Sequence, residues 1–334
     1  MKPLAEQVVV ITGASSGIGR ETALHFAQHG ARVALVARNQ EALAEVESEI
    51  IEGGGQALAI PADVSDWDQV QHVAQQAVER LGRIDTWVNN AAVTLYSWFE
   101  DVTPQEFKRV IDVNLMGQVY GARAALPYLK MTQGTLIGIG SVESELPVPL
   151  QTPYVASKHA LKGFYDTLRL EQEHAQTGVQ VSFLMPASID TPLFDHALSH
   201  LGYKPRPLPP VYDPRIVADA ILYAAQKPVR DMAVGGGGAL LARVISCWPR
   251  AADAALQRIA YRGQLTQQPE LPTGPNNLWQ PMPGKGSTRG GFSALSFDPY
   301  TWIRLRPTVL TALAGAALTA LLVPLAGLWM KRNT

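Results

Sequence analysis

A tyrosine and a lysine lie one helical turn apart near the middle of the chain. Tyr154 and Lys158 occupy positions i and i+4 of the segment 152–158. Pro153 suits the first turn of a helix and Thr152 is the expected cap, so both side chains should share one helix face. A positive charge at ~4 Å in an effective dielectric of ~20 is worth roughly 4 kcal/mol, enough to bring a tyrosine pKa from ~10 toward ~7. The pair is a candidate acid/base catalyst, although the same spacing occurs by chance in many helices.

A glycine-rich turn near the N-terminus gives a second, independent signal. The β-branched run Gln7–Ile11 leads into Gly13, Gly17 and Gly19, and a helical pattern follows. This order of strand, turn and helix places backbone amides where they can bind a pyrophosphate. The spacing is G-x-x-x-G-x-G rather than the G-x-G-x-x-G of the general dinucleotide fingerprint. A flexible turn without a ligand is the alternative interpretation.

Together these segments resemble the classical short-chain dehydrogenase/reductase (SDR) family over roughly residues 5 to 235. Thr12–Gly19 resembles the family's cofactor motif, and Asn89–Ala92 resembles its Asn-Asn-Ala-Gly strand end. Ala92 and Ala187 each stand where the family has glycine, which puts loop geometry in doubt more than activity. The residues that resemble the family's catalytic tetrad are Asn114, Ser141, Tyr154 and Lys158.

The resemblance implies a role for each member of this tetrad. Ser141 would hydrogen-bond the substrate oxygen and Tyr154 would pass it a proton, while a nicotinamide delivers hydride to the carbonyl carbon. Lys158 would lower the pKa of the tyrosine and bind the nicotinamide ribose. Asn114 would hold a water that connects the lysine to solvent.

The resemblance also implies further contacts with the cofactor. Asp63 and Val64 would lie against the adenine, although Asp63 could instead cap a helix. Thr191 would lie near the nicotinamide carboxamide. The full set of expected cofactor-binding residues is Gly13, Ser15, Ser16, Gly17, Ile18, Gly19, Arg38, Asp63, Val64, Asn90, Ala91, Tyr154, Lys158, Pro186, Ile189 and Thr191.

The end of the second predicted strand indicates which cofactor is preferred. Where an acidic residue would bind the adenosine ribose of NAD, the chain has Ala37 followed by Arg38. Arginine supplies a planar, permanently charged group that matches a 2′-phosphate. The sequence therefore predicts that NADP(H) is preferred over NAD(H). A solvent-exposed arginine at a helix start is the alternative.

Alternating strand and helix patterns predict the fold. Apolar runs separated by charged amphipathic helices indicate a Rossmann-like α/β fold, with a doubly wound parallel sheet in three layers over residues 1–235. The motif residues then fall at the carboxyl ends of strands, where such sheets bind ligands. Besides Gln7–Ile11, strands are expected at Arg32–Val36, Gln56–Ile60, Ile84–Val88, Leu136–Ile139 and Val179–Leu184.

Composition argues against several functional classes. The formal net charge is −1 and no basic stripe is interleaved with aromatics, so nucleic acid is an improbable partner. Cys247 is the single cysteine, which excludes an intrachain disulfide and suits a reducing compartment. The histidines show no ligand spacing, so no metal is expected. The N-terminus lacks the pattern of a signal peptide.

The C-terminal part is predicted as an extension that ends in a membrane anchor. Residues 307–330 carry no charge and are flanked by arginine and lysine, which suits a single transmembrane helix, with a soluble oligomer-forming helix as the alternative. The catalytic domain is then expected in the cytoplasm. Residues 236–265 suggest an amphipathic helical extension lying on the bilayer, and residues 266–303 an irregular linker.

The expected function is that of an NADPH-preferring oxidoreductase interconverting a carbonyl and an alcohol on a small or lipophilic substrate. Leu193 and Phe194 could line an apolar pocket under the proline-rich stretch Lys204–Pro210, or simply pack there. The alternatives are an NAD-dependent alcohol dehydrogenase and a non-catalytic cofactor-binding scaffold, whose mark would be a broken tetrad. The family resemblance further implies a homo-oligomer.

Overall fold

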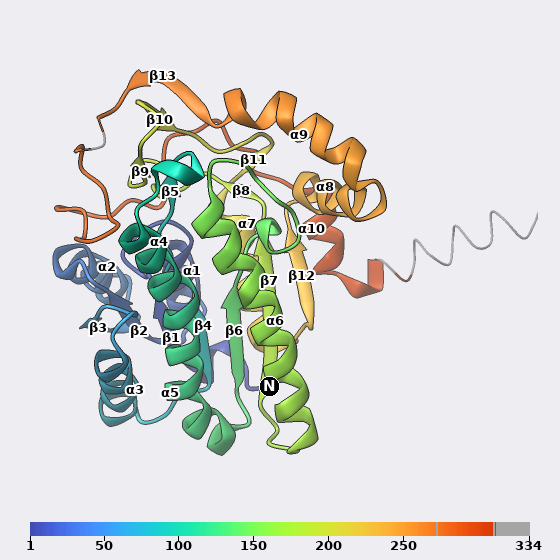
Figure 1. Cartoon of the computed structure of the whole chain (residues 1–334). Coiled ribbons are helices and arrows are strands. Elements are labelled where there is room, and N and C mark those ends of the chain that lie inside the picture. Colours follow the sequence, from blue (N-terminus) through green and yellow to red (C-terminus); the bar gives the residue numbers. More distant parts are fainter. Residues whose placement is uncertain (272, 310, 312–334) are drawn as a thin grey trace, which may run out of the picture.

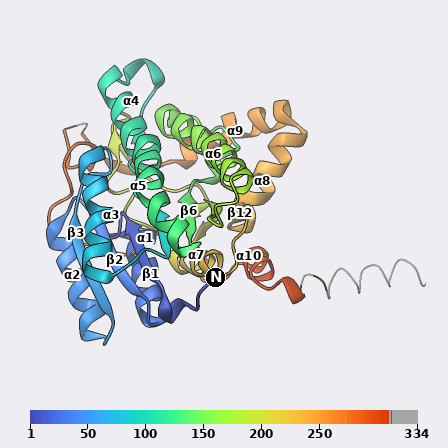
Figure 2. The ribbon, with the colours of Figure 1, turned by 90° about the horizontal axis from the view of Figure 1, so that it is seen from below.

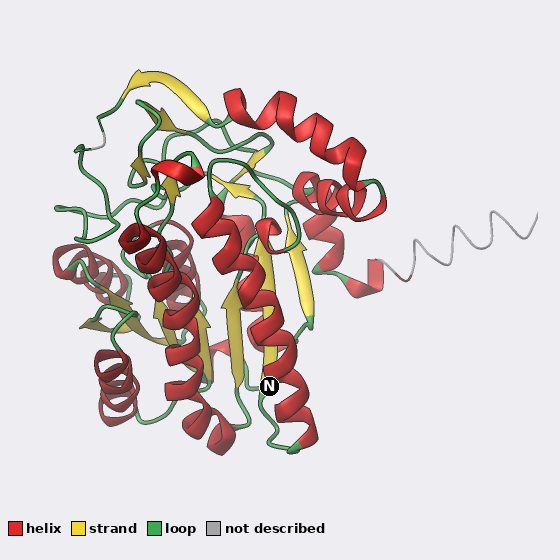
Figure 3. Ribbon diagram, viewed as in Figure 1, coloured by secondary structure: helices red, strands yellow, loops and turns green. Residues whose placement is uncertain are grey.

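The computed structural model describes residues 1–271, 273–309 and 311. Within them, a parallel seven-stranded sheet lies between two layers of helices (Figures 1 and 3). The strand order is β12-β7-β6-β4-β1-β2-β3, which confirms the doubly wound fold. The strands are β1 (Val8–Thr12), β2 (Arg32–Ala37), β3 (Gln56–Pro61), β4 (Thr86–Asn89), β6 (Thr135–Ile139), β7 (Gln180–Pro186) and β12 (Asp231–Val234).

The two helical layers cover opposite faces of the sheet (Figure 2). Side chains alternate between the faces of a strand, so Val9 and Ile11 pack with one layer and Val10 with the other. The first layer contains α1 (Gly17–Gln28), α2 (Gln40–Glu52) and α7 (Pro214–Gln226). The second contains α3 (Trp67–Leu81), α4 (Pro104–Ile111), α5 (Gly117–Thr132) and α6 (Thr152–His174).

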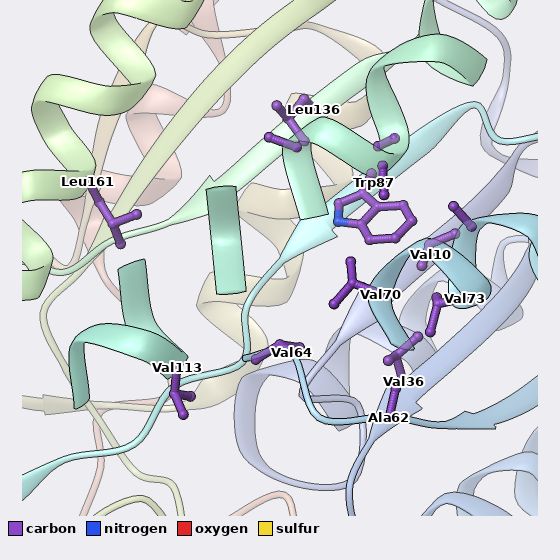
Figure 4. Packing of buried hydrophobic residues seen from close by; sticks show 14 of the residues in the cluster. Val10, Val36, Ala62, Val64, Val70, Val73, Trp87, Val113, Leu136 and Leu161 are labelled. Atoms are coloured by element: carbon purple, nitrogen blue, oxygen red, sulfur yellow. The ribbon is translucent and has the colours of Figure 1, made fainter. Parts of the chain in front are cut away.

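A buried tryptophan anchors the strand that leads to the centre of the site. Trp87 on β4 is fully buried among Val10, Val70 and Leu136 (Figure 4). Its indole N–H donates to Asn89 Oδ1 at 2.8 Å, so this polar atom is satisfied inside the core. The packing fixes the carboxyl end of β4, from which Asn90 and Ala91 follow.

The predicted start of the catalytic helix needs one correction. Gln151 precedes α6 as its N-cap and makes no side-chain capping bond, whereas Thr152 is the first helical residue and not the cap. Pro153 lies in the first turn as predicted, because its fixed φ suits that place and a first-turn N–H has no helical partner. Tyr154 and Lys158 therefore lie on one helix, one turn apart.

The region predicted as an amphipathic helical extension over 236–265 is divided into two helices. The chain forms α8 (Gly236–Cys247) and α9 (Pro249–Gly263), because Pro249 cannot continue a preceding helix and Trp248 leaves helical geometry. Ala242 and Ile245 on α8 are buried against the 146–148 loop, so part of the apolar face packs on the protein.

The region predicted as an irregular linker over 266–303 also contains regular structure. It begins in β13 (Leu265–Pro269), which pairs antiparallel with β10 (Tyr203–Pro205), and ends in α10 (Pro299–Arg304). The remaining short elements are 3-10 turns at Leu4–Glu6, Phe99–Asp101 and Val142–Ser144, a π-helical turn at Asp112–Met116, and β5 (Leu95–Tyr96), β8 (Ser188–Ile189), β9 (Leu198–Ser199) and β11 (Val211–Tyr212).

The predicted transmembrane segment 307–330 lies almost entirely outside the described residues. In the part of the chain that the structure describes, none of the helices combines the length and apolar character needed to span a bilayer. The anchor therefore stays a prediction.

Candidate active site

Most of the predicted site residues lie along one cleft at the carboxyl ends of the strands. This cleft runs from the glycine turn after β1 to the start of α6. Gly19 and Asn114 are the two predicted residues that do not line it. Those that do are Gly13, Ser15, Ser16, Gly17, Ile18, Arg38, Asp63, Val64, Asn90, Ala91, Ser141, Tyr154, Lys158, Pro186, Ile189 and Thr191.

The glycine turn has no room for side chains at two of its positions. Gly13 has φ +71°, and a Cβ there would lie 2.8 Å from Asn90 Nδ2. A Cβ on Gly19 would overlap the carbonyl oxygen of Gly13. The backbone thus approaches the cleft closely at the N-terminus of α1, and this cradle fits the pyrophosphate of a dinucleotide.

The end of β4 is tied to the end of β1 by Thr12. Its Oγ1 accepts hydrogen bonds from Asn90 N at 2.9 Å and from Ala91 N at 3.1 Å. In return, Asn90 Nδ2 donates to the carbonyl oxygen of Thr12 at 2.9 Å. These bonds hold Asn90 and Ala91 against the glycine turn as one wall of the cleft.

Asp63 is held by an arginine that sequence reasoning did not single out. Arg109 Nη2 lies 2.7 Å from Asp63 Oδ2. Burial alone would raise the pKa of Asp63, but Arg109 and hydrogen bonds from Ser65 outweigh it and hold this pKa below its usual value. The proposed capping role is wrong, since Asp66 caps α3 by accepting from Asp68 N and Gln69 N.

Arg38 bonds to a distant part of its own chain. Its Nη1 donates to the carbonyl oxygen of Trp279 at 3.0 Å, and its Nη2 donates to that of Asn277. Asp63 Oδ2 is 4.0 Å from Nη1. The alternative of a solvent-exposed arginine is therefore wrong, and residues 277–287 form a covering segment that the sequence did not reveal.

Three members of the tetrad meet at the centre of the cleft. Tyr154 is 8% exposed and Lys158 is 1% exposed. Lys158 Nζ lies 5.3 Å from the centre of the Tyr154 ring and donates to the carbonyl oxygen of Ile139 at 3.0 Å. Ser141 follows β6 at the start of the 3-10 turn Val142–Ser144, and its side chain interacts with the hydroxyl of Tyr154. A substrate oxygen placed there would face both hydroxyl groups.

The expected lowering of the tyrosine pKa is wrong. Burial raises the pKa of Tyr154, the negative charge of Glu143 raises it further, and the hydrogen bond to Ser141 lowers it. Burial also lowers the pKa of Lys158 to about 8, against the opposing effect of Glu143. Burial and the charge of Glu143 disfavour the charged phenolate more than Ser141 favours it.

Asn114 lies behind the cleft, in the π-helical turn between α4 and α5. Its amide donates to Val93 O at 2.9 Å and to Ser157 Oγ at 3.1 Å, and its Oδ1 accepts from Val93 N at 2.8 Å. The side chain is thus bonded to the loop after β4 and to α6, not to Lys158. Its expected role in a water path to the lysine stays a prediction.

The loop after β7 closes the side of the cleft where the resemblance places the nicotinamide. Pro186 ends β7, and Ile189 belongs to β8, which pairs with β11. Thr191 is buried, and its side chain lies 3.1 Å from the position of a Cβ on Gly17. The loop therefore lies directly over the glycine turn. Further along, Leu193 and Phe194 line the cleft, and the Phe194 ring packs edge-on against Phe292 at 5.8 Å.

The substrate end of the cleft contains polar residues that sequence reasoning missed. Gln151 Nε2 donates to Gln264 Oε1 at 2.7 Å, and Thr94 Oγ1 donates to Gln151 Oε1 at 3.2 Å. Gln264 belongs to the C-terminal extension and still lines this cleft. Glu143 Oε2 is buried without a hydrogen-bond partner among the described residues. In the sequence, only the position of Glu143, two residues after Ser141, indicates that it belongs to the site.

Comparison with known proteins agrees with this geometry. Residues 7–201 match the short chain dehydrogenase family. An uncharacterized oxidoreductase of Bacillus subtilis, YxnA, is 39% identical over 320 residues, covering 93% of this chain and 89% of the relative. The Arabidopsis thaliana protein 11-beta-hydroxysteroid dehydrogenase 1A is 38% identical over 191 residues, which cover 56% of this chain and 53% of that protein.

Two solved structures have the same fold. A short-chain type dehydrogenase/reductase from Mycobacterium marinum has a TM-score of 0.63 and 29% identity, covering 70% of this chain and 96% of that chain. An alcohol dehydrogenase from Thermococcus sibiricus, complexed with 5-hydroxy-NADP, has a TM-score of 0.60 and 28% identity, covering 68% of this chain and 94% of that chain.

Proposed function

Because the chain belongs to the short-chain dehydrogenase family and is an NAD(P)-dependent oxidoreductase, we propose that it interconverts a carbonyl and an alcohol with a preference for NADPH. The observation that supports this most directly is the meeting of Ser141, Tyr154 and Lys158 in the cleft that also contains the glycine turn. Acid/base groups and a dinucleotide cradle in one cleft suit hydride transfer with coupled proton transfer.

Each of these side chains has a distinct task in the reaction. A bound nicotinamide supplies hydride in reduction and accepts it in oxidation. Ser141 donates a hydrogen bond to the substrate oxygen and orients it beside Tyr154. The phenol of Tyr154 gives that oxygen a proton in reduction and takes one back in oxidation. Lys158, held by Ile139, stabilises the phenolate that forms.

The preference for NADPH rests on Arg38 at the end of β2. The neighbouring Ala37 cannot repel a 2′-phosphate, and the arginine has five donors, of which two bind the carbonyls of Asn277 and Trp279. The Thermococcus relative was solved with an NADP derivative, which supports the same preference here.

The substrate is proposed to be of modest size and to carry polar groups beside its reacting carbon. Leu193, Phe194 and Leu208 give the cleft apolar walls, whereas Glu143 and Gln264 place hydrogen-bonding groups near the tyrosine. The hydroxysteroid dehydrogenase names of the Arabidopsis relatives add steroids as one candidate class.

The proposed function is tested with Tyr154→Phe. Losing the proton donor should lower turnover by about 10²- to 10⁴-fold, because general acid/base catalysis contributes that much. The affinity for NADPH should change less than about twofold, since a phenyl ring fills the same space. Nicotinamide absorbance reports turnover with steroid ketones, long-chain aldehydes and small ketones, and calorimetry reports NADPH binding.

Tyr128→Phe on α5 is the matched control and should keep wild-type turnover. Wild-type turnover by Tyr154→Phe would refute the acid/base assignment. Binding of NADH more tightly than NADPH by the wild-type protein would refute the cofactor preference.

We further propose that residues 307–330 attach the protein to a membrane, leaving the catalytic domain in the cytoplasm. The proposal rests on the uncharged composition of this segment and on the basic residues at its two ends. A site close to the bilayer would suit a substrate that partitions into lipid. We also infer, from family resemblance, that the protein assembles as a homo-oligomer.

A further inference from the structure

Residues 277–287 lie across the adenosine side of the cleft. In Figure 1 the chain that follows β13 runs beside α2, at the carboxyl end of the sheet. Asn39 Nδ2, at the start of α2, donates to the carbonyl oxygens of Met282 at 2.7 Å and Gly284 at 2.9 Å. Leu278 is fully buried in the core, and Arg109 Nε donates to its carbonyl oxygen at 2.9 Å. The segment is therefore a packed part of the site.

The same segment touches the glycine turn. Gly17 N donates to the carbonyl oxygen of Ser287 at 2.9 Å. A Cβ on Gly286 would overlap the carbonyl oxygen of Ser15, so this position accepts glycine alone without a shift of the backbone. The run Gly284–Gly291 is thus a second glycine-rich stretch, in direct contact with the first one.

Lys285 stands between these two attachments. The residue before it bonds to Asn39 after β2, and the residue after it adjoins Ser15 in the glycine turn. Lys285 lines the cleft, is exposed, and forms no ion pair with any residue that the structure describes. The space between the end of β2 and the glycine turn is where the adenosine ribose of a dinucleotide lies.

We propose that Lys285 binds the 2′-phosphate of NADP(H), so that the C-terminal extension completes the cofactor site and determines its specificity. This inference rests on the proposed function, because it requires a dinucleotide in the cleft. Arg38 then has two roles: its bonds to Asn277 and Trp279 hold the 277–287 segment in place, and its remaining donors face the phosphate. The ammonium of Lys285, at the end of a flexible side chain, adds a second positive charge opposite Arg38.

Calorimetric titration of the full chain with NADPH and with NADH tests the proposal. Lys285→Ala should weaken NADPH binding about tenfold, the effect of losing one charge-assisted hydrogen bond, and should change NADH binding less than about twofold. Lys130→Ala on α5, far from the cleft, is the matched control and should leave both affinities unchanged.

Unchanged NADPH affinity in Lys285→Ala would overturn the proposal, and an equal loss for both cofactors would overturn the assignment to the 2′-phosphate. Failure of the wild-type protein to bind either cofactor would instead overturn the proposed function.

Limited trypsin digestion of the wild-type protein gives a readout that needs no variant. Cleavage after Lys285 should slow when NADPH is added, and should slow much less with NADH at equal saturation. Equal protection by the two cofactors would contradict the proposal.

Discussion

At the scale of single residues, the catalytic centre is governed by desolvation. Tyr154, Lys158 and Glu143 are ionisable groups in one pocket, and burial shifts the pKa of each toward its neutral form. The spacing of tyrosine and lysine identified the two partners, but it could not give the direction of the tyrosine pKa shift. That direction depends on burial and on Glu143, which lies outside α6 in the 3-10 turn Val142–Ser144.

Glu143 makes the stability of the protein depend on pH. Burial raises the pKa of this carboxyl to about 8 from an ordinary value of 4.5. The folded protein therefore keeps a proton that the unfolded chain has lost, and this group's contribution to stability falls as pH rises from about 4.5 to about 8. Glu143→Gln cannot ionise, so its free energy of unfolding should rise relative to wild type over that interval.

Urea unfolding at pH 5, 6.5 and 8 measures this difference. The exposed neighbour Glu145 supplies the control, since Glu145→Gln should follow the wild-type pH dependence. Parallel curves for Glu143→Gln and wild type would show that the carboxyl is solvated in the folded protein.

At the scale of elements, hydrophobic periodicity predicted six of the seven strands of the sheet. The seventh, β12, was missed because Asp231–Val234 is short and has no alternating pattern, and its place is set by backbone pairing with β7. Pro249 explains the break between α8 and α9, and the sequence alone could have predicted this break. The 277–287 segment could not be predicted, because irregular chain gives no periodic pattern and its partner Arg38 lies 241 positions away from Trp279.

The close fit of the 277–287 segment can be tested at Gly286. In Gly286→Ala the new methyl group would overlap Ser15 O, and overpacking of this kind costs about 1–3 kcal/mol. We expect lifting of the segment to relieve the overlap, so trypsin should cleave after Lys285 faster than in wild type. The main unfolding transition in urea should change little.

Gly163 on α6 provides the control, because a Cβ there meets no atom within 4 Å. Gly163→Ala should leave cleavage after Lys285 unchanged and stabilise the helix by up to about 1 kcal/mol. Wild-type cleavage of Gly286→Ala would mean that Gly286 is not held against Ser15.

At the scale of the whole molecule, the C-terminal extension contributes residues to the proposed active-site cleft. Gln264 from the end of α9 and residues 277–287 both line the cleft formed by the first 235 residues. The boundary predicted at residue 235 therefore marks the end of the sheet, but it does not separate two functional units.

The predicted anchor can be removed without disturbing these contacts. A chain that ends at Arg306 retains every residue that lines the cleft, so it should bind NADPH like the full chain. Fractionation of cells should find the full chain with the membranes and the shortened chain in the supernatant after carbonate washing. Recovery of the full chain in the supernatant would refute membrane attachment.

The rings of Phe194 and Phe292 contact each other edge-on and so connect the two segments that cover the cleft. Phe194 belongs to the loop above the nicotinamide side, and Phe292 follows the segment above the adenosine side. We expect release of the spent cofactor to require movement of both segments, and release of a small product to require movement of one. We therefore expect an ordered kinetic scheme in which the dinucleotide enters first, departs last, and limits steady-state turnover by its dissociation.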